Sequence, residues 1–495
     1  MQGAADNLGA RSRCSPSIAL PRAAGPVAPA LSGANVVFGH TLEYIRGPEA
    51  FLQRGWREHG EVFRCRLGAR WYTVVLGPEH NKFFFRKTDD LLSIRDSYPF
   101  FPRMFGKDFF FFAPYEEYMR QRGVVLPKFK SEAMRSYVAS MVEETGDAIA
   151  GLGDAGELDL IPALGPLVMN IAAHAFLGRD FRRRLDDGFF DVFRDFSGGM
   201  EMAWPLWLPL PHLRRSRRAR RWLDRIFSGW IRHRRENPAD PPDFFQNLID
   251  ATLADGTPIS EELTVNLILM LIWAGHETTT GQLAWTLIDL LQHPDYLDEV
   301  RDEIDGTLGD RPPAEIGWPE VRALAGLECA VKESERLHPV AHVAMRRAAE
   351  DLRIGGCHVP RGMYVLAAPC VSHLMPDVFP DPHAYRPRRF ERGSASTSLE
   401  ANRLIGFGGG MHRCLGVNFA RLEMKIVLAL FVRHYDMELL DPPRTVSGTS
   451  ARWPAQPTRV RYAARTAAPP RMATEAVAAH PVAATGGCPF HGEQS

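Results

Sequence analysis

One cysteine in a glycine-rich segment is the residue of this sequence best suited to bind a metal. Residues 407–416 read FGGGMHRCLG, which places Cys414 directly before an apolar helical pattern over residues 415–434. Glycine allows backbone conformations and close approaches that other residues do not, and the amino-terminal end of a helix favours a negative sulfur. A thiolate here could bind a metal. As an axial ligand of haem iron it would promote cleavage of the O–O bond of dioxygen.

Taken alone, this segment allows other interpretations. A lone cysteine commonly serves as a small buried apolar residue, and clustered glycines commonly mark turns. Gly406, Gly408 and Gly409 also resemble part of a dinucleotide-binding loop. That loop would need a preceding strand, a suitably spaced third glycine and an acidic residue downstream, and these are not evident in the sequence.

A second polar group lies within the longest apolar helical pattern. Residues 261–293 are expected to form one helix, capped by Ser260 and ended by Pro294. At about 1.5 Å per residue it would span about 50 Å. Its first half is apolar on nearly every face, as expected of a helix buried on all sides. Within it, Glu277 and Thr278 place a carboxyl beside a hydroxyl. This pair could open the helical ladder and handle protons, or simply bond to the preceding turn.

A third signal is a pair of opposite charges. Glu333 and Arg336 are three residues apart in a predicted helix and therefore share one face. On the surface such a pair contributes little to stability. A buried pair would need a further partner to compensate the loss of water.

These segments together resemble the cytochrome P450 family. Residues 407–416 meet every fixed position of its haem-binding pattern F-x-x-G-x-H/R-x-C-x-G, and residues 274–279 resemble its oxygen-activation segment A/G-G-x-D/E-T-T/S. Its E-x-x-R helix and P-x-R-F loop are matched at residues 333–336 and 387–390. The resemblance covers about residues 35–463 and implies the mainly α cytochrome P450 fold with a small β-rich lobe.

The resemblance also implies roles for individual residues. Haem b (iron protoporphyrin IX) would be bound through Cys414, with Glu277 and Thr278 relaying protons to dioxygen. The remaining expected residues are His412, Arg346 and Arg122 for the haem propionates, Phe407 and Gly408 for the haem loop, Glu333, Arg336 and Arg389 for a structural network, and Tyr98, Phe101, Phe105, Ala274 and His276 for the substrate pocket. Arg347 is the alternative to Arg346, because adjacent strand residues face opposite ways.

The implied reaction is monooxygenation, in which one oxygen atom enters an apolar C–H bond and the other leaves as water. The aromatic segment 98–112 and residues 457–462 are similar to the sterol 14-alpha-demethylase subgroup, which favours a large sterol or triterpenoid substrate. Glu277 departs from that subgroup, which commonly carries histidine there. A fatty-acid or terpene hydroxylase is one alternative. An oxygen-independent haem-thiolate isomerase and a non-catalytic haem sensor are alternatives of other classes, and neither would need Glu277 and Thr278.

Composition limits the partners and the compartment. The chain has 495 residues and a formal net charge of zero, which does not favour a nucleic-acid partner. Its seven scattered cysteines indicate a reducing compartment, and no transmembrane segment is evident, so we expect a cytoplasmic monomer. Without a recognisable flavin or iron–sulfur module, electrons would come from a separate ferredoxin and its reductase.

The ends and one internal segment complete the expectations. Residues 1–34 and 464–495 are rich in Ala and Pro and are expected to be disordered tails around a single haem-thiolate domain, 35–463. Residues 204–211, rich in Trp and Pro, precede an arginine cluster and suggest either peripheral contact with an anionic membrane or a solvated helix.

Overall fold

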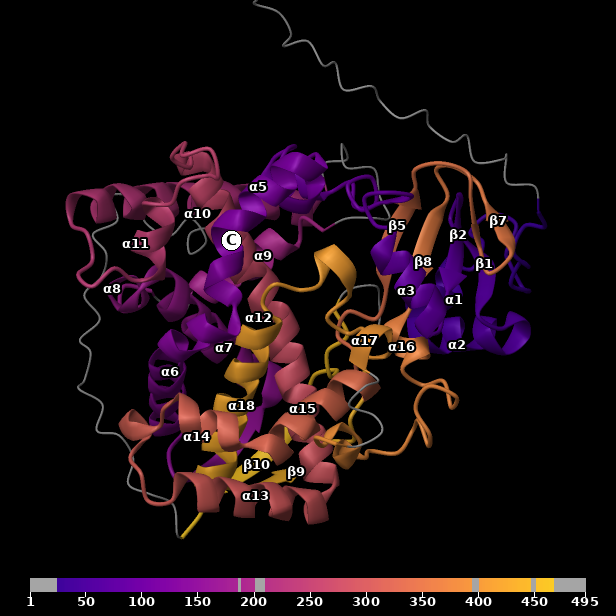
Figure 1. The fold of residues 1–495 in the computed structure, drawn as a ribbon. Coiled ribbons are helices and arrows are strands. Elements are labelled where there is room, and N and C mark those ends of the chain that lie inside the picture. Colours follow the sequence, from indigo (N-terminus) through magenta and orange to yellow (C-terminus); the bar gives the residue numbers. More distant parts are fainter. Residues whose placement is uncertain (1–24, 186–187, 201–209, 394–399, 447–450, 467–495) are drawn as a thin grey trace, which may run out of the picture.

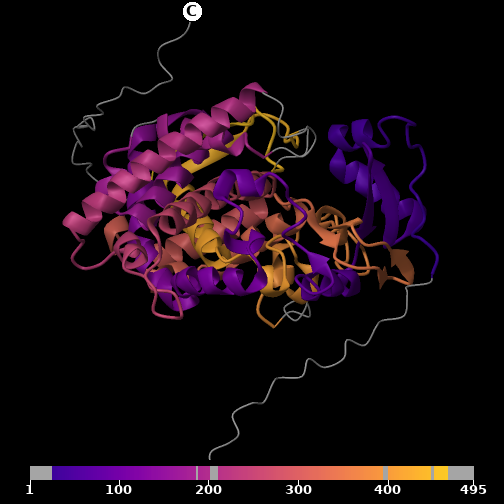
Figure 2. The ribbon, with the colours of Figure 1, turned by 90° about the horizontal axis from the view of Figure 1, so that it is seen from above.

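A large helical part and a smaller β-rich lobe lie side by side in the structure (Figure 1). The computed structural model describes residues 25–185, 188–200, 210–393, 400–446 and 451–466. The mainly α architecture with a small β lobe that the sequence predicts is confirmed. Seen from above in Figure 2, the N-terminal lobe forms one side of the molecule, and the long helix α10 runs along an edge of the helical part.

The helices account for most of the described chain. Their bounds are α1 Thr41–Arg46, α2 Pro48–His59, α3 Pro78–Arg86, α4 Phe101–Phe105, α5 Tyr115–Val125, α6 Val138–Leu152, α7 Leu160–Leu177, α8 Arg179–Arg182, α9 Gly188–Ser197, α10 Pro211–Glu236, α11 Phe244–Ile249, α12 Glu261–Gln292, α13 Pro294–Leu308, α14 Trp318–Ala323, α15 Ala325–Leu337, α16 Pro369–Ser372, α17 Glu400–Arg403 and α18 Val417–His434.

The strands form three small sheets. Their bounds are β1 Val62–Leu67, β2 Arg70–Val75, β3 Leu92–Ser93, β4 Ala155–Asp159, β5 Ala344–Ala348, β6 Leu352–Ile354, β7 Cys357–Val359, β8 Tyr364–Ala367, β9 Tyr435–Leu439 and β10 Arg459–Ala464. The largest sheet has the order β1-β2-β8-β5-β3, in which β2 and β8 are parallel. A second sheet has the order β4-β10-β9, and β6 pairs with β7.

Helix α12 is the central element of the helical part. The Ser260 hydroxyl accepts a hydrogen bond from the Leu263 amide at 3.1 Å, as the capping pattern predicts. Beyond the cap the helix is buried over most of its length, because its side chains are apolar on nearly every face. It packs against α7, α15 and α18, and α18 carries the cysteine loop at its amino-terminal end.

Helix α7 is long and apolar enough to cross a membrane by length and composition. Most of it is buried inside the protein, where it packs against α12 and α6. Its apolar surface is therefore used in the core, as in many buried helices.

Part of the predicted N-terminal tail packs on the β lobe. Val27 and Ala30 form bridges with His358 and Arg64, and the Leu31 side chain is buried. The rest of both predicted tails, residues 1–24 and 467–495, lies outside the described residues, as does the tail segment 488–491, which contains a cysteine and a histidine.

Candidate active site

The cysteine loop is closed by its own backbone. The Cys414 amide donates a hydrogen bond to the Phe407 carbonyl at 2.9 Å, just before α18 begins. Gly410 has a φ of 62°, and a Cβ there would lie 2.5 Å from the carbonyl oxygen of Phe85. Only glycine fits this position. The loop therefore holds the cysteine at the start of α18, as the sequence predicts.

The Cys414 side chain is open on one side, yet protein atoms surround its sulfur closely. Burial raises the pKa of the thiol above its ordinary value, and the Gly416 amide and the Arg413 guanidinium oppose this rise. The sequence suggested that the loop and helix alone would favour the thiolate, but in the protein burial outweighs them. A bound metal cation would reverse this balance, because its charge stabilises the deprotonated sulfur.

Several donors gather around one carboxylate beside this loop. The His412 imidazole bonds to Asp89, and its ring stacks on Tyr118 at 4.6 Å. Burial raises the pKa of Tyr118 to about 12, and the Arg122 guanidinium partly opposes the rise. Burial lowers the pKa of Arg346, and Tyr98, Asp89 and Tyr118 lie close enough to oppose this fall. The predicted propionate ligands are thus brought to one place.

The two adjacent arginines of β5 point in opposite directions. Arg346 is buried, donates to the Thr88 hydroxyl at 3.0 Å and lies over the Phe84 ring at 5.1 Å. Arg347 is exposed and donates to the Gly362 carbonyl. The alternative left open by the sequence is therefore settled by the strand register, which turns Arg346 inward.

One face of the buried helix α12 is accessible. Ala274 and Thr278 are exposed, whereas the residues next to them are half-buried or buried, and their spacing of four places them on the same face. The Thr278 hydroxyl donates to the Ala274 carbonyl at 2.8 Å. The helix continues through Gly275 without a break, so the polar residues do not open it.

Glu277 and His276 are directed away from this face. The Glu277 carboxyl lies near α9: burial raises its pKa, while the Ser197 hydroxyl and the Arg194 guanidinium lower it. His276 is buried between Phe190 and Phe193 of α9, with ring centroids 5.9 and 6.1 Å away. The structure therefore brings Ala274 and Thr278 together, and it places His276, predicted for the substrate pocket, on the other side of α12.

The aromatic residues predicted to line the pocket form one cluster. Phe101 and Phe105 stack at 5.8 Å, and both contact Trp273 of α12, at 5.5 and 5.6 Å. Tyr98 meets Phe101 edge to face, and its hydroxyl accepts the Met345 amide at 3.1 Å. Trp273 was missed in the sequence, although it directly precedes the oxygen-activation segment. It connects the aromatic cluster to the accessible face.

The Glu333 network is complete and buried. Arg336 donates to both carboxylate oxygens of Glu333, at 2.7 and 2.8 Å, and neither side chain is exposed. Arg389 donates to the same carboxylate at 3.2 Å, and the Arg386 amide does so at 2.8 Å. Arg336 also reaches the carbonyls of Pro382 and Ala384. The predicted residues therefore meet in a hydrogen-bonded cluster.

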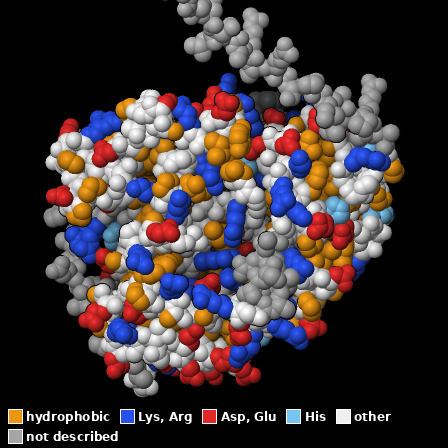
Figure 3. Space-filling model, viewed as in Figure 1, with side chains coloured by type: hydrophobic (Ala, Val, Ile, Leu, Met, Phe, Trp, Pro, Cys, Tyr) orange, Lys and Arg blue, Asp and Glu red, His pale blue; other side chains and the backbone are white. Residues whose placement is uncertain are grey.

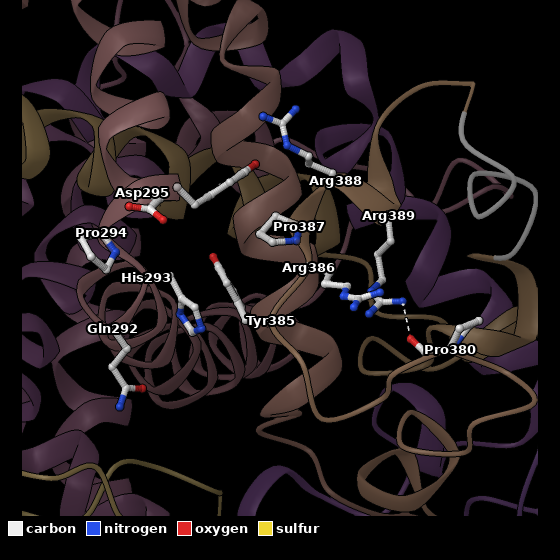
Figure 4. A pocket seen from close by; sticks show the side chains of 11 residues that line it. Gln292, His293, Pro294, Asp295, Pro380, Tyr385, Arg386, Pro387, Arg388 and Arg389 are labelled. Carbon is white, nitrogen blue, oxygen red and sulfur yellow. Dashed lines mark hydrogen bonds between the residues drawn. The ribbon is translucent and has the colours of Figure 1, made fainter.

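A cavity of about 620 Å³ opens on the outer side of this network (Figure 4). Tyr385 stacks on His293 there at 4.4 Å, and Arg389 donates to the Pro380 carbonyl at 3.1 Å. Of the predicted site residues only Arg389 lines this cavity. It belongs to the loop that supports α15 and does not reach Cys414.

These residues fit a haem. The Cys414 thiol is open on one side, and the glycine loop places no side chains beside it. Cationic groups gather at one edge around the Asp89 carboxylate. The buried Nε of Arg122 has no hydrogen-bond partner among the described residues, so it remains free to bind a carboxylate. Together they define a haem-thiolate protein.

Comparisons with known proteins agree with this class. The profile of the family Cytochrome P450 matches residues 29–460, and the chain belongs to this family. It is 31% identical to the sterol 14alpha-demethylase of Mycobacterium tuberculosis (strain ATCC 25618 / H37Rv) over 88% of this chain and 98% of that protein. It is 28% identical to the lanosterol 14-alpha demethylase of Bos taurus, with 81% of each chain covered.

A solved structure shares the fold. The retinoic acid-bound cyanobacterial CYP120A1 superposes with a TM-score of 0.79 and 25% identity, covering 89% of this chain and all of that chain. The chain is a cytochrome P450 monooxygenase with haem b as its cofactor. It acts on an apolar substrate with dioxygen and takes electrons from redox partners. The predicted cofactor and reaction class are confirmed.

Proposed function

We propose that this monooxygenase oxidises a sterol or triterpenoid, by hydroxylation or demethylation. The observation that carries the proposal is the accessible face of α12, bordered by Trp273 with Phe101 and Phe105 packed against it. Flat aromatic walls suit a large, rigid and apolar ligand. The names of the bacterial and bovine relatives support the same substrate class.

Haem b bound through Cys414 would supply the redox chemistry that activates dioxygen. Phe407 and Gly408 hold the loop beside it, since the Gly408 amide bonds to Ile405 and the Phe407 ring lies under Arg421 at 5.4 Å. His412, Arg346 and Arg122 bind the propionates, because each offers donors at the shared edge near Asp89. In this scheme the haem propionates accept part of the hydrogen bonding and charge pairing that the Asp89 carboxylate provides in the structure.

Thr278 and Glu277 manage protons. The Thr278 hydroxyl lies on the accessible face and donates a hydrogen bond to the Ala274 carbonyl. Its oxygen keeps lone pairs that can accept a hydrogen bond from another group. Glu277 faces α9, and burial raises its pKa, so it holds a proton more readily than an exposed glutamate. The pair connects the α9 side of the helix to the face where the chemistry occurs.

The network of Glu333, Arg336 and Arg389 has a structural role. Its carboxylate joins α15 to the loop of residues 380–390 through two donors of the loop, the Arg389 side chain and the Arg386 amide. Because all three groups are buried or nearly so, the network fixes the loop on the side of the fold that supports α18.

The redox partners are a ferredoxin and its reductase. Lys and Arg side chains gather across the middle of the face in Figure 3, over the region of α15 and α18 in Figure 1. Arg413, next to the thiolate, is exposed and suits an acidic donor. Lys425, another basic residue of the segment that follows the thiolate, is buried and pairs with Glu328 at 3.5 Å, so it is not available to a donor.

The protein works as a cytoplasmic monomer that touches an anionic membrane surface. Helix α10 presents an arginine-rich face, exposed at Arg214, Arg215, Arg217, Arg218, Arg221, Arg225, Arg232 and Arg235. Exposed apolar side chains lie near the N-terminus, at Val36, Val37, Phe38, Leu42 and Ile45. Apolar groups combined with basic ones favour such contact. Most of the Trp-rich segment that suggested it, 204–211, lies outside the described residues, which resume at residue 210.

A spectral titration of the ferric protein tests the substrate class. Sterols, triterpenoids, fatty acids and smaller terpenes are compared for a saturable shift of the Soret band, followed by product analysis with a surrogate ferredoxin, its reductase and NADPH. We expect the shift and coupled oxygen consumption with sterols or triterpenoids. A response only to fatty acids or small terpenes would assign the enzyme to that hydroxylase class, and turnover without oxygen would contradict the proton roles of Glu277 and Thr278.

A further inference from the structure

We propose that Trp453 is a positioning residue for the proton-relay turn of α12. Its indole Nε1 donates a hydrogen bond to the Glu277 carbonyl at 3.0 Å, from a position 176 residues away in the chain. This carbonyl belongs to the peptide that joins Glu277 to Thr278. The inference rests on the function proposed above, because it gives that peptide its importance.

The bond acts on a rigid unit. The Glu277 carbonyl and the Thr278 amide lie in one peptide plane, so holding the oxygen also holds the amide and the α-carbon of Thr278. In an α-helix the same oxygen accepts the amide of Gly281, and a carbonyl has a second lone pair for the indole. Trp453 therefore restrains the orientation of Thr278 without touching its side chain.

Gly281 makes room for the indole. A Cβ built on Gly281 would lie 2.5 Å from Cδ1 and 3.0 Å from Nε1 of Trp453. Glycine in a helix interior weakens the helix relative to alanine. The other glycine of this helix, Gly275, has nothing within 4 Å of such a Cβ. At position 281 the absence of a side chain is thus required by the approach of Trp453.

The segment that carries Trp453 is held from several sides. The neighbouring Arg452 pairs with Glu49 of α2, and its amide donates to the Val340 carbonyl at 3.1 Å. Trp285, further along α12, donates its indole N–H to the Arg452 carbonyl at 2.8 Å. The indole of Trp453 is consequently a fixed support that joins α2, α12 and the end of α15.

Loss of this support should change how dioxygen is used. If Thr278 is displaced, protons are no longer delivered to the oxygen atom where they promote O–O cleavage. Dioxygen that takes up two electrons and two protons without this cleavage leaves as hydrogen peroxide. We therefore expect W453F, which removes only the donor from an aromatic side chain, to lower the yield of product per NADPH about fivefold, the factor associated with one net hydrogen bond.

Trp285→Phe is the matched control. It removes an indole donor of the same kind from α12, but the lost bond ends on Arg452 and not on the relay turn. Gly281→Ala gives a second variant, because the added methyl group pushes the indole away while alanine strengthens the helix. Hydrogen exchange of the α12 peptide containing residues 274–282 provides a readout that does not depend on turnover.

The expected result is that W453F and G281A produce more peroxide and exchange residues 274–282 about fivefold faster, while W285F does neither. Equal coupling and equal exchange in W453F and W285F would overturn the inference. Thr278→Val is measured alongside: if it stays coupled, the proposed function itself fails, whereas an uncoupled T278V with a fully coupled W453F refutes only the role of Trp453. Should W453F not bind haem, G281A decides by the same two measurements.

Discussion

Two groups of buried polar residues in this protein are treated in opposite ways. Around Glu333, the charges lie in a closed set of hydrogen bonds from Arg336, Arg389 and the backbone. In the middle of α12, His276 has no well-formed hydrogen bond to any described residue on either ring nitrogen. The first arrangement stabilises the fold, and the second tolerates unfavourable burial on the side of α12 that faces α9, away from Thr278.

The difference follows from the cost of burying polar groups. A buried charge or imidazole that loses water without gaining a partner destabilises the folded state, and a fully bonded network avoids this cost. The under-bonded His276 directly precedes the relay residues Glu277 and Thr278 in the chain. The buried polar residues of α15 therefore stabilise the fold, whereas those in the middle of α12 lie next to the residues proposed to carry out the chemistry.

The largest effect is expected from opening the bonded network. Glu333→Ala leaves two arginines buried without their carboxylate and should lower the free energy of unfolding by about 3 to 5 kcal/mol. Arg388→Ala is the control, since Arg388 pairs with Glu299 and Glu391 on the surface and its loss should change stability far less. Urea unfolding followed by circular dichroism measures both. Equal losses would show that the network adds nothing special.

His373 and His276, both buried, provide the next test of this comparison. His373 uses both nitrogens, bonding the Arg336 carbonyl at 3.1 Å and the Ile405 amide at 2.9 Å. Burial lowers the pKa of His276 to about 4, and its ring has no such partners in the part of the chain that the structure describes. At pH 7 His373→Leu should cost about 2 kcal/mol because it orphans two backbone groups. His276→Leu should cost less than about 1 kcal/mol.

The pH dependence of His276 has a definite sign. Because its folded pKa lies below the ordinary value of 6.5, the unfolded chain binds the proton more readily, and stability falls as the pH decreases from 6.5 through about 4. A shift of this size corresponds to about 3 kcal/mol at the acid end. His276→Leu should remove this part of the acid sensitivity in urea titrations between pH 7 and 4. An unchanged acid profile would contradict the burial assigned to His276.

A smaller effect concerns the hydroxyl on the accessible face. Thr278→Val should reduce product formed per NADPH about tenfold and increase peroxide, because proton delivery depends on a correctly placed group. Thr280→Val is the matched control: Thr280 makes the same kind of bond, to the His276 carbonyl, but it is buried. Equal uncoupling of both variants would indicate a general effect on the helix instead of a role in proton transfer.

The smallest effect comes from a third buried group. Glu423 of α18 is buried, its Oε1 lacks a hydrogen-bond partner in the described part of the chain, and burial raises the pKa of its carboxyl well above the ordinary value. Stability should therefore decrease as the pH rises through and above the unfolded pKa. Glu423→Gln should gain about 1 kcal/mol at neutral pH and nothing in acid. A loss at neutral pH would point to an ionised carboxylate.

Local patterns in the sequence were enough for the main elements. The bounds of α12 followed from its apolar run, the cap at Ser260 and the stop at Pro294, and the cysteine loop followed from its glycines. The partners of Glu333 were predicted because the two segments that supply them carry recognisable spacing. In these cases the signal lies within a few residues of the feature.

The features that could not be predicted from the sequence depend on contacts between distant segments of the chain. The inward turn of Arg346 depends on the register of β5 against β8, and the position of Asp89 near His412 joins residues 323 apart. Trp453 reaches α12 from close to the C-terminal end of the fold. Helical periodicity also could not show that α9 covers His276. The face of α12 that carries His276 would be apolar whether it packed against α9 or lined the substrate pocket.

The central claim is that the sulfur of Cys414 binds haem iron. The reduced protein treated with carbon monoxide should show the long-wavelength Soret band typical of a thiolate ligand, and Cys414→Ser should lose it while the protein still folds. If the native protein lacks this band, or if the serine variant keeps it, the account of this site is wrong.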